Sequence, residues 1–465
     1  MCSVRVEPPT HSIVEYFHLR DESGRSCGYC KGEHGSFSDG MWAHSMSCEN
    51  YESLINNGWR RSGCYLYKPR NSKTCCPVYT IRNISSKVEI TRSQRKVLKR
   101  FKKYLHDGII PTKTKYSRDY QQQSNTMELL HSNTPANVQH HVNKTHSTPS
   151  IQVVEEKMDD VTPESQVPKK EHPLKKKRLR RERKRAKLIA KGEDPEEFFK
   201  RNERNRVNEL RDFFKPKHDD KVRFSTKLVQ VDSPDFDDVF TNEHLLYMKY
   251  QMHTHGDKEH DCRASQFRRF LCDNPFNNSP DKGAVKQGTF HTHYYMNDNL
   301  IAVGVVDVLA SCVSSVYFFY DPDYSFLSPG TLGALHEISF VNEMRAIDPS
   351  LQYYYLGYYI HKCDKMKYKR KFRPCQLLCP VNNQFVDFDT RINNILDQVN
   401  GGFSKLTTNQ TIHSNNDVNN VLILHNRRVL PFDRYPKKEE EREELTQYVE
   451  LVTSRIASNM LVYRS

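Results

Sequence analysis

Hydrophobic residues recur at helical spacing between Ser93 and His106, and this pattern predicts a helix there. Five of them fall on one face of that helix: Val97, Leu98, Phe101, Tyr104 and Leu105. Gly108 follows as a C-terminal stop. The opposite face carries six cations: Arg95, Lys96, Lys99, Arg100, Lys102 and Lys103. Such a face suits a phosphate backbone, and it suits an ordinary solvated surface equally well.

Residues 216–465 alternate between strand-like and helix-like patterns. Runs of β-branched and aromatic residues predict strands at 222–231, 300–309, 313–320 and 353–361. Helical patterns occupy 243–252, 265–271 and 438–458. This alternation predicts an α/β (α+β) domain that is long enough to bury its own core.

The segment between these regions differs in composition. Residues 116–168 are rich in Gln, Asn, Ser, Thr and His, and we expect a disordered linker because so few apolar residues cannot offset the ordering entropy. Residues 169–215 form a basic helical segment, in which the run from Lys175 to Lys187 holds ten cations and one acid. Asp194 and Pro195 open a second helix that runs through Phe214. The basic run fits RNA contact or a nuclear import signal, and the two roles are compatible.

The charge balance favours a polyanionic partner. The chain has 71 Lys and Arg against 57 Asp and Glu, so its formal net charge is +14. Thirteen cysteines, together with an N-terminus that lacks an apolar run, indicate a reducing compartment, and we expect the cytoplasm and the nucleus. No stretch approaches the roughly 20 apolar residues of a membrane span, so we expect no membrane partner. We also expect a monomer.

Four cysteines within residues 1–115, the predicted Cys-rich N-terminal domain, have metal-ligand spacing. Cys27 and Cys30 form a C-x-x-C turn, and Cys75 and Cys76 are adjacent. The fold could bring the two pairs together into a four-thiolate site. Four thiolates suit zinc or an iron–sulfur cluster. Other ligands are close in sequence: Cys48, Cys64, His34 and His44.

Several motifs at both ends of the chain resemble one family. They are SIVEYF, CGYC, GMWAHSM, GWRRSG and CCPVYTIR, then GTFHTHYYMNDNLIAVGVVDVL, SSVYFFYDPDYSFLSPG, YYYLGYYIHKCDKMKYKRKFRP and LLCP. The chain is identified by them as a member of the eukaryotic arginyl-tRNA–protein transferases. The resemblance implies transfer of arginine from arginyl-tRNA to the N-terminal amine of acceptor proteins that begin with Asp or Glu. The product would be read as a signal for ubiquitin-dependent degradation, and the family is associated with an iron–sulfur cluster.

The resemblance also implies an acetyltransferase-like (GNAT-type) mixed sheet in residues 216–465. The strand near Val316, the turn after Tyr320 and the helix from about Thr331 to Ile338 resemble the phosphate-binding turn of that fold. The phosphate would belong to the tRNA acceptor end, and we expect no coenzyme A. The candidate residues of the turn are Ser328, Gly330, Thr331 and Gly333.

The implied reaction is direct aminoacyl transfer, which needs no covalent enzyme intermediate because the tRNA ester is already activated. The arginine guanidinium requires a carboxylate, and the candidates are Asp307, then Asp321, Asp323 and Glu337. His361, and also His291 and His293, could act as general base.

A basic loop near the last of these strands mixes cations with aromatic residues, as nucleic-acid and acidic substrates require. Its candidate binding residues are Lys365, Lys367, Tyr368, Lys369, Arg370 and Arg373. A rival interpretation is a non-catalytic, metal-stabilised RNA-binding protein, and a third is a coenzyme-A-dependent acetyltransferase. An acidic pocket at the strand–turn–helix would favour the transferase, since an RNA-binding protein has no use for one.

Overall fold

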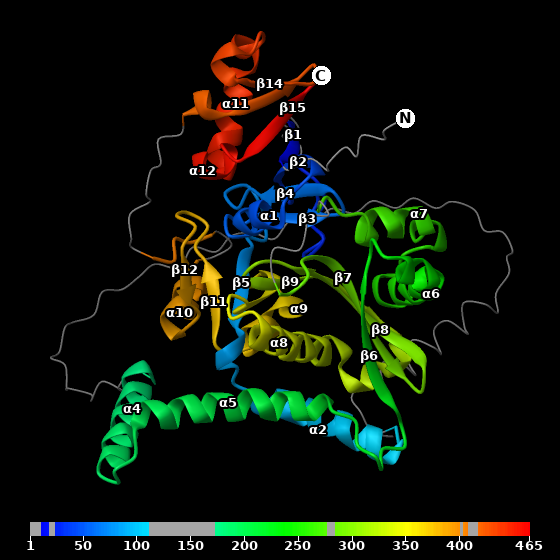
Figure 1. Ribbon diagram of the computed structural model, residues 1–465, viewed down its shortest axis with the longest axis vertical. Helices are drawn as coiled ribbons and strands as arrows, with labels where there is room; N and C mark the ends of the chain where they lie inside the picture. The colour runs from blue at the N-terminus through cyan, green and yellow to red at the C-terminus, as the bar shows by residue number, and fades with distance from the viewer. Residues whose placement is uncertain (1–10, 18–23, 111–172, 277–283, 400–402, 408–416) are drawn as a thin grey trace, which may run out of the picture. The chain divides into compact units, whose positions relative to one another are not determined.

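The computed structural model (Figure 1) describes residues 11–17, 24–110, 173–276, 284–399, 403–407 and 417–465. The predicted disordered linker, 116–168, lies outside these residues. The chain divides into one unit of residues 1–110 and 197–465 and a second unit of residues 111–196. Among the described helices, none is both long and apolar enough to cross a membrane.

The larger unit contains an eight-stranded mixed sheet in the order β12-β11-β5-β10-β9-β8-β7-β6. Its strands are β5 (Tyr79–Ile84), β6 (Phe224–Gln230), β7 (Gly288–Met296), β8 (Asn299–Val308), β9 (Cys312–Tyr320), β10 (Tyr353–Tyr359), β11 (Cys375–Leu378) and β12 (Phe385–Asp387). The predicted mixed α/β class is confirmed. β9 and β10 are parallel neighbours, and helix α8 (Pro329–Ile347) connects them.

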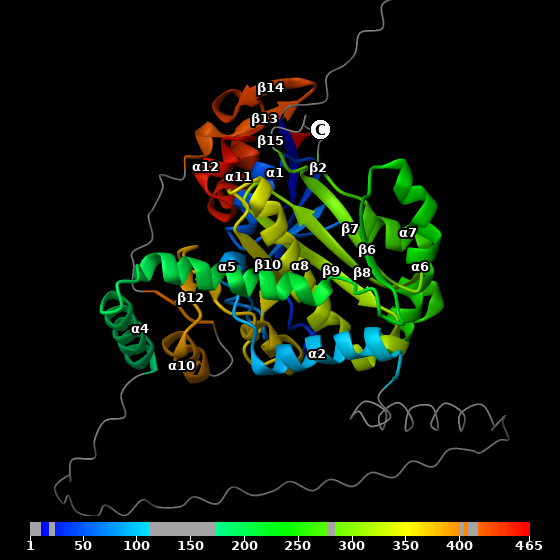
Figure 2. The ribbon, with the colours of Figure 1, turned by 60° about the horizontal axis from the view of Figure 1, so that its bottom comes forward.

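Helices cover both faces of this sheet. Helices α2 (Arg92–Asp107) and α5 (Pro195–Phe214) share one hydrophobic core with α8. Figure 2 shows the ribbons of these three helices. Helices α6 (Pro234–His255) and α7 (Ala264–Phe267) contribute to another core. Ala302 of β8 belongs to the first core, whereas Val303 belongs to the second. Two-sided burial explains why β8 is almost continuously apolar.

Helix α2 confirms the prediction for residues 93–106 to within a residue at each end. Thr91 and Gln94 form a capping box at its start, and Gly108 ends it in a left-handed conformation with φ 67°. Its apolar face is buried as expected, but its cationic face is not all free. Arg95 pairs with Glu209, and Arg100 donates a hydrogen bond to Ser328.

A seven-stranded sheet joins the two ends of the chain in the order β14-β13-β15-β1-β2-β4-β3. Its strands are β1 (Ser12–Phe17), β2 (Ser38–Ser45), β3 (Arg60–Ser62), β4 (Tyr65–Pro69), β13 (Leu422–His425), β14 (Arg428–Pro431) and β15 (Met460–Arg464). Strand β1 pairs in parallel with β15, and β5 lies between β10 and β11. The Cys-rich segment therefore shares hydrogen-bonded sheets with the C-terminal half.

Three of the expected helices have different bounds. The helix predicted at 243–252 is the longer α6, because Pro234 opens it and Gly256 ends it at φ 73°. The helix predicted at 265–271 begins as α7 and continues as a π-helical turn, Arg268–Cys272. The helix predicted at 438–458 breaks at Thr453, whose φ is 75°, into α11 (Lys438–Val452) and α12 (Ser454–Ala457).

Three shorter helices complete the elements used below: α1 (Cys48–Ile55), α9 (Asp364–Lys367) and α10 (Thr390–Gln398). In the second unit, the predicted basic helix is α4 (Pro173–Ile189). Its residues 181–187 are all exposed, so the cations among them are accessible to solvent.

Candidate functional site

A cleft of about 580 Å³ opens where β9 and β10 separate. The two strands pair only from Tyr353 with Cys312 to Tyr355 with Ser314. The cleft is lined by Ser315 and Phe318 of β9, by Gly330, Ala334 and Glu337 of α8, and by Tyr354 and Tyr358 of β10.

Glu337 is an acid in this cleft with one carboxylate oxygen left free. Its side chain is 2% exposed, and its Oε2 accepts a hydrogen bond from the Tyr354 hydroxyl. Among the described residues, Oε1 has no hydrogen-bond partner. Burial raises the pKa of Glu337 to about 7. A buried, unsatisfied carboxylate oxygen is costly unless a ligand completes it, so Glu337 is suited to bind a cation.

The surrounding packing leaves room for this carboxylate only because small residues face it. A Cβ at Gly304 of β8 would collide with Glu337 Oε1, and a Cβ at Gly333 would collide with the Phe318 ring. Gly333 was predicted to bind phosphate, but the structure gives it a packing role between α8 and β9. Gly330 is the member of the predicted phosphate turn that lines the cleft.

Two basic side chains of the cleft, Lys369 and Arg60, lie beside strand β10. The Lys369 Nζ donates to the Tyr358 carbonyl at 2.8 Å, and burial, together with the nearby Arg60 guanidinium, lowers the pKa of Lys369 to about 7. Arg60 is only 6% exposed, lies 4.9 Å from the Tyr358 ring centroid and donates to the Trp59 carbonyl at 2.6 Å. The cleft therefore holds a fixed cation and an amine poised to exchange a proton near neutral pH.

Asp307 has a different environment from the one its sequence position suggested. Its carboxylate accepts from Arg61 Nη2 at 2.6 Å and from Arg61 Nε at 2.8 Å, and both side chains are fully buried. Thr289 donates to it as well, at 2.9 Å. We correct our first choice of guanidinium partner accordingly, because Asp307 is bound by Arg61 and is not a lining residue of the cleft.

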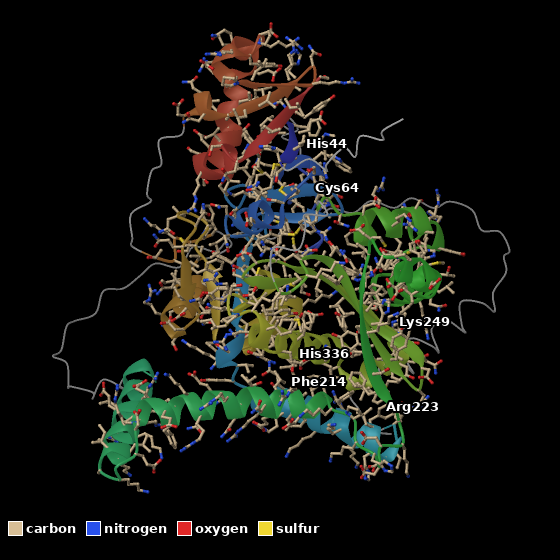
Figure 3. All side chains as sticks on the ribbon, viewed as in Figure 1. His44, Cys64, Phe214, Arg223, Lys249 and His336 are labelled. Carbon is tan, nitrogen blue, oxygen red and sulfur yellow. The ribbon has the colours of Figure 1, made fainter. Side chains whose placement is uncertain are left out.

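The other predicted acids and the predicted base also lie apart from Glu337. Asp321 and Asp323 both pair with Lys249 of α6, at 2.6 and 2.8 Å, beside a separate cavity of about 690 Å³. Figure 3 labels Lys249. His361 bonds to Asp397 at 2.7 Å and to the Tyr359 hydroxyl at 2.9 Å. It lines a different cavity, next to the cysteines. These three residues are not brought together with Glu337.

The basic loop is divided between the cleft and other partners. Lys365, Tyr368 and Lys369 line the cleft. Lys367 pairs with Asp364 at 2.8 Å, and Arg370 donates to Asn393 at 3.0 Å. Of the remaining candidates, Ser328 holds Arg100, the Thr331 N–H bonds to the Ser328 carbonyl at 2.9 Å, and Arg373 is exposed.

The four predicted cysteines converge. Their Sγ atoms lie within 4.8 Å of one another, and Cys30 Sγ is 3.4 Å from Cys75 Sγ. The Cys27 N–H bonds to the Gly32 carbonyl at 2.8 Å, which closes the first thiolate turn. The Gly32 N–H, with Cys75 beside it, lowers the pKa of Cys30 to about 7. A compact four-sulfur set with an acidified thiol fits a metal ion or cluster, although the donor set does not distinguish zinc from iron–sulfur.

The other nearby ligands are not part of this cluster. His44 pairs with Glu15 at 2.9 Å, and burial raises the pKa of Cys48 to about 12. The cluster adjoins the cavity that holds His361. Tyr29, which lies between Cys27 and Cys30, lines both that cavity and the Glu337 cleft, and so does Lys365. The turn that carries Cys27 and Cys30 thus supplies part of the cleft wall.

The segments of this chain that match known proteins include residues of both the cleft and the cysteine cluster. The family model "Arginine-tRNA-protein transferase, N terminus" matches residues 25–96, and "Arginine-tRNA-protein transferase, C terminus" matches residues 242–379. The "Arginyl-tRNA--protein transferase 1" of Drosophila melanogaster is 34% identical over 418 residues, which cover 83% of this chain and 84% of that protein. The chain belongs to the arginyl-tRNA–protein transferase family.

Other members of the family are similar over much of their length. The "Arginyl-tRNA--protein transferase 2" of Arabidopsis thaliana is 31% identical, over 78% of this chain and 73% of that protein. A shorter match is the "Aspartate/glutamate leucyltransferase" of Campylobacter jejuni, 33% identical over 142 residues, which cover 30% of this chain and 53% of that protein. The predicted resemblance is confirmed, and this arginyl-tRNA–protein transferase family member is an enzyme.

The sequence analysis did not anticipate the roles of two cleft residues, Arg60 and Lys369. Arg60 stands in the motif GWRRSG, which marked the family but suggested no role for its arginines. Lys369 was predicted to bind tRNA, whereas its lowered pKa suits proton transfer. The cation-rich loop was a usable signal for Lys369, but nothing in the sequence separated it from its five neighbouring cations.

Proposed function

We propose that this enzyme transfers arginine from arginyl-tRNA to the N-terminal amine of proteins that begin with Asp or Glu, in the cleft between β9 and β10. One observation carries the proposal: a buried carboxylate with a free oxygen, Glu337, lies in one cleft with Arg60 and Lys369. An acidic group there supports an enzyme that recognises a cationic amino acid, and an RNA-binding surface would not need one.

Glu337 would bind the guanidinium of the arginine that is being transferred. A carboxylate offers two oxygens to the forked N–H groups of a guanidinium. Bound guanidinium would also lower the pKa of Glu337 and keep it ionised, because an opposite charge favours the charged form. Arg60 would bind the side-chain carboxylate of the acceptor's first residue, which gives a reason for a preference for Asp or Glu.

Lys369 would act as general base. The α-amine nitrogen attacks the ester carbonyl carbon of arginyl-tRNA, and its proton passes to the neutral Lys369 amine. The bond from that carbon to the ribose oxygen then breaks, and the ribose oxygen takes the proton back from the Lys369 ammonium. A pKa of about 7 suits both steps. The remaining acceleration would come from holding the two substrates together.

The tRNA acceptor end would enter over Tyr368 and Lys365, which combine a stacking ring with a cation at the cleft. Coenzyme A has no part in this reaction. Zinc or an iron–sulfur cluster on the four cysteines would hold Tyr29 in the cleft wall. We also propose that the product is a signal for ubiquitin-dependent degradation, and that the monomeric enzyme works in the cytoplasm and, through its basic helix α4, in the nucleus.

The first experiment incubates the purified chain, prepared without oxygen, with arginyl-tRNA and a peptide that begins with Asp. Mass spectrometry should show a peptide heavier by one arginine residue, and a peptide that begins with Gly should stay unchanged. Equal modification of both peptides would disprove the acceptor rule. No modification, with tRNA still bound in a gel-shift assay and the metal present, would favour the RNA-binding alternative.

A further inference from the structure

Three buried side chains converge on the face of the sheet that α6 covers. They are Glu243 of α6 with His291 and His293 of β7, and all three are 0% exposed. His291 and His293 are two residues apart on one strand, so their rings project from the same face. One nitrogen of each ring and a carboxylate oxygen all lie within 4.8 Å of one another.

The outer hydrogen bond of His291 fixes which of its nitrogens carries a proton. His291 Nε2 lies 3.1 Å from the Leu271 carbonyl oxygen, which can only accept, so Nε2 is protonated. In a neutral imidazole, Nδ1 then presents a lone pair, and Nδ1 lies 2.6 Å from Glu243 Oε2. That separation is a hydrogen-bond distance, so a proton lies between the two atoms here. Two ligands of one zinc ion, each about 2.0–2.2 Å from it, would lie about 3 Å apart, which a small movement of either side chain provides.

The second histidine faces the same carboxylate. His293 Nε2 contacts Glu243 Oε1, and its Nδ1 lies 3.2 Å from the Tyr295 hydroxyl. Protons alone can also satisfy this cluster, because the Tyr295 hydroxyl can donate to His293 Nδ1, His293 Nε2–H can donate to Glu243, and one proton shared between Glu243 and His291 completes the set. One divalent ion would instead bond to all three groups at once, since their ligand atoms lie within 4.8 Å of one another.

We propose that Glu243, His291 and His293 form a second metal site, which takes a divalent transition-metal ion such as zinc. Two imidazoles and one carboxylate are an established set of zinc ligands. Metal-bound histidines usually donate their outer N–H to a carbonyl or a similar acceptor, as His291 does to Leu271. The four cysteines are a separate ligand set, so this ion would be additional to theirs.

The role of this ion is to fasten α6 to β7. The same helix continues to Tyr250 and His255, which line the Glu337 cleft. The apolar neighbours of the site include Phe236, whose ring centroid lies 5.0 Å from that of His291. A closed apolar surround with inward-facing ligands suits a structural ion that is acquired as the chain folds.

The test measures metal content and ligand type on the full chain expressed in zinc-supplemented medium. Elemental analysis should find about one zinc per chain fewer in Glu243→Gln and in His293→Gln than in the wild type. His336→Gln should lose none, because His336 is a half-buried histidine of α8 whose neighbours are Tyr294 and Phe214 (Figure 3). Equal zinc in the wild type and both site variants would overturn the proposal.

X-ray absorption at the zinc edge of the wild-type chain decides the matter even if the variants do not fold. Nitrogen and oxygen scatterers at about 2.0 Å are expected, with sulfur at about 2.3 Å only where zinc also occupies the cysteines. A spectrum of sulfur ligands alone, or a wild-type chain without zinc, would overturn the proposal and leave a proton-bridged carboxylate in its place.

Discussion

Asp307 and Glu337 are both buried acids near the same strands, yet their carboxylates differ in how fully they are hydrogen-bonded. Arg61 and Thr289 satisfy the carboxylate of Asp307, which is fully enclosed. Glu337 lines a cleft and has one oxygen held by Tyr354, while the other, which faces Gly304, has no hydrogen-bond partner among the described residues. An acid that meets its counter-ion inside the protein contributes to structure, whereas an acid left incomplete at a cleft is available for a substrate.

Breaking the Asp307 pair should have the largest effect on stability. Asp307→Asn leaves the buried Arg61 guanidinium without a counter-charge, so the free energy of unfolding should fall by about 3–5 kcal/mol. Denaturant unfolding followed by circular dichroism measures this loss. A fall of less than about 1 kcal/mol, the size expected of an exposed ion pair, would show that the pair is not isolated from water.

Removal of the amine at Lys369 should have the largest effect on activity. Lys369→Met should lower kcat/KM by about 10²- to 10⁴-fold, as the loss of a general base does. Because the pKa of Lys369 is lowered to about 7, its neutral form accumulates above pH 7 and the wild-type rate should rise through that pH. The variant should follow only the acceptor amine, whose ordinary pKa is about 7.7–8.0. An unchanged pH–rate profile would exclude Lys369 as the base.

Glu337→Gln should change the pH dependence of stability, in contrast to Asp307→Asn. The pKa of Glu337 is raised from 4.5 to about 7 in the folded state, so the folded chain keeps a proton that the unfolded chain loses. Stability from this group is therefore complete below pH 4.5 and declines as the pH rises to 7, by about 3 kcal/mol. Glutamine removes this decline, so the variant should gain on the wild type between pH 5 and 7.5. Parallel stability curves would contradict the raised pKa.

Asp323→Asn supplies the smallest effect and a control for the other acids. Asp323 pairs with Lys249 at 2.8 Å, but its side chain is 59% exposed. Exposed pairs contribute at most about 1 kcal/mol, and salt screens them. The free energy of unfolding, measured in low and in high salt, should differ little between this variant and the wild type. A loss of stability comparable to that of Asp307→Asn would show that solvent exposure does not explain the difference between the two acids.

Sequence reasoning reached features whose cause is local or repeated. The helix at 93–106 was predictable from its apolar spacing and the glycine after it. The four-cysteine cluster was predictable from residue type and spacing. It failed where a partner comes from elsewhere in the fold. Asp307 meets Arg61 across 246 residues of sequence, and the free oxygen of Glu337 depends on Gly304 opposite it.

The same limit explains the charge states. The lowered pKa of Lys369 depends on burial beside Arg60, which stands on β3, far from the basic loop in sequence. The cluster of Glu243, His291 and His293 needs α6 to pack on β7 before it exists. Composition revealed an excess of cations, but it did not reveal which lysine would have its pKa lowered to about 7.

The central claim is that Glu337 recognises the guanidinium of the transferred arginine. The most direct test compares single-turnover transfer from tRNA charged with arginine and from the same tRNA acylated with citrulline, whose side chain has nearly the same shape but no charge. The wild type should transfer arginine about 10- to 10²-fold faster, since a charged hydrogen-bonded pair contributes about 1.5–3 kcal/mol. Glu337→Gln should transfer both at similar rates. If the variant still prefers arginine as strongly as the wild type does, another residue binds the guanidinium and this account of the cleft is wrong.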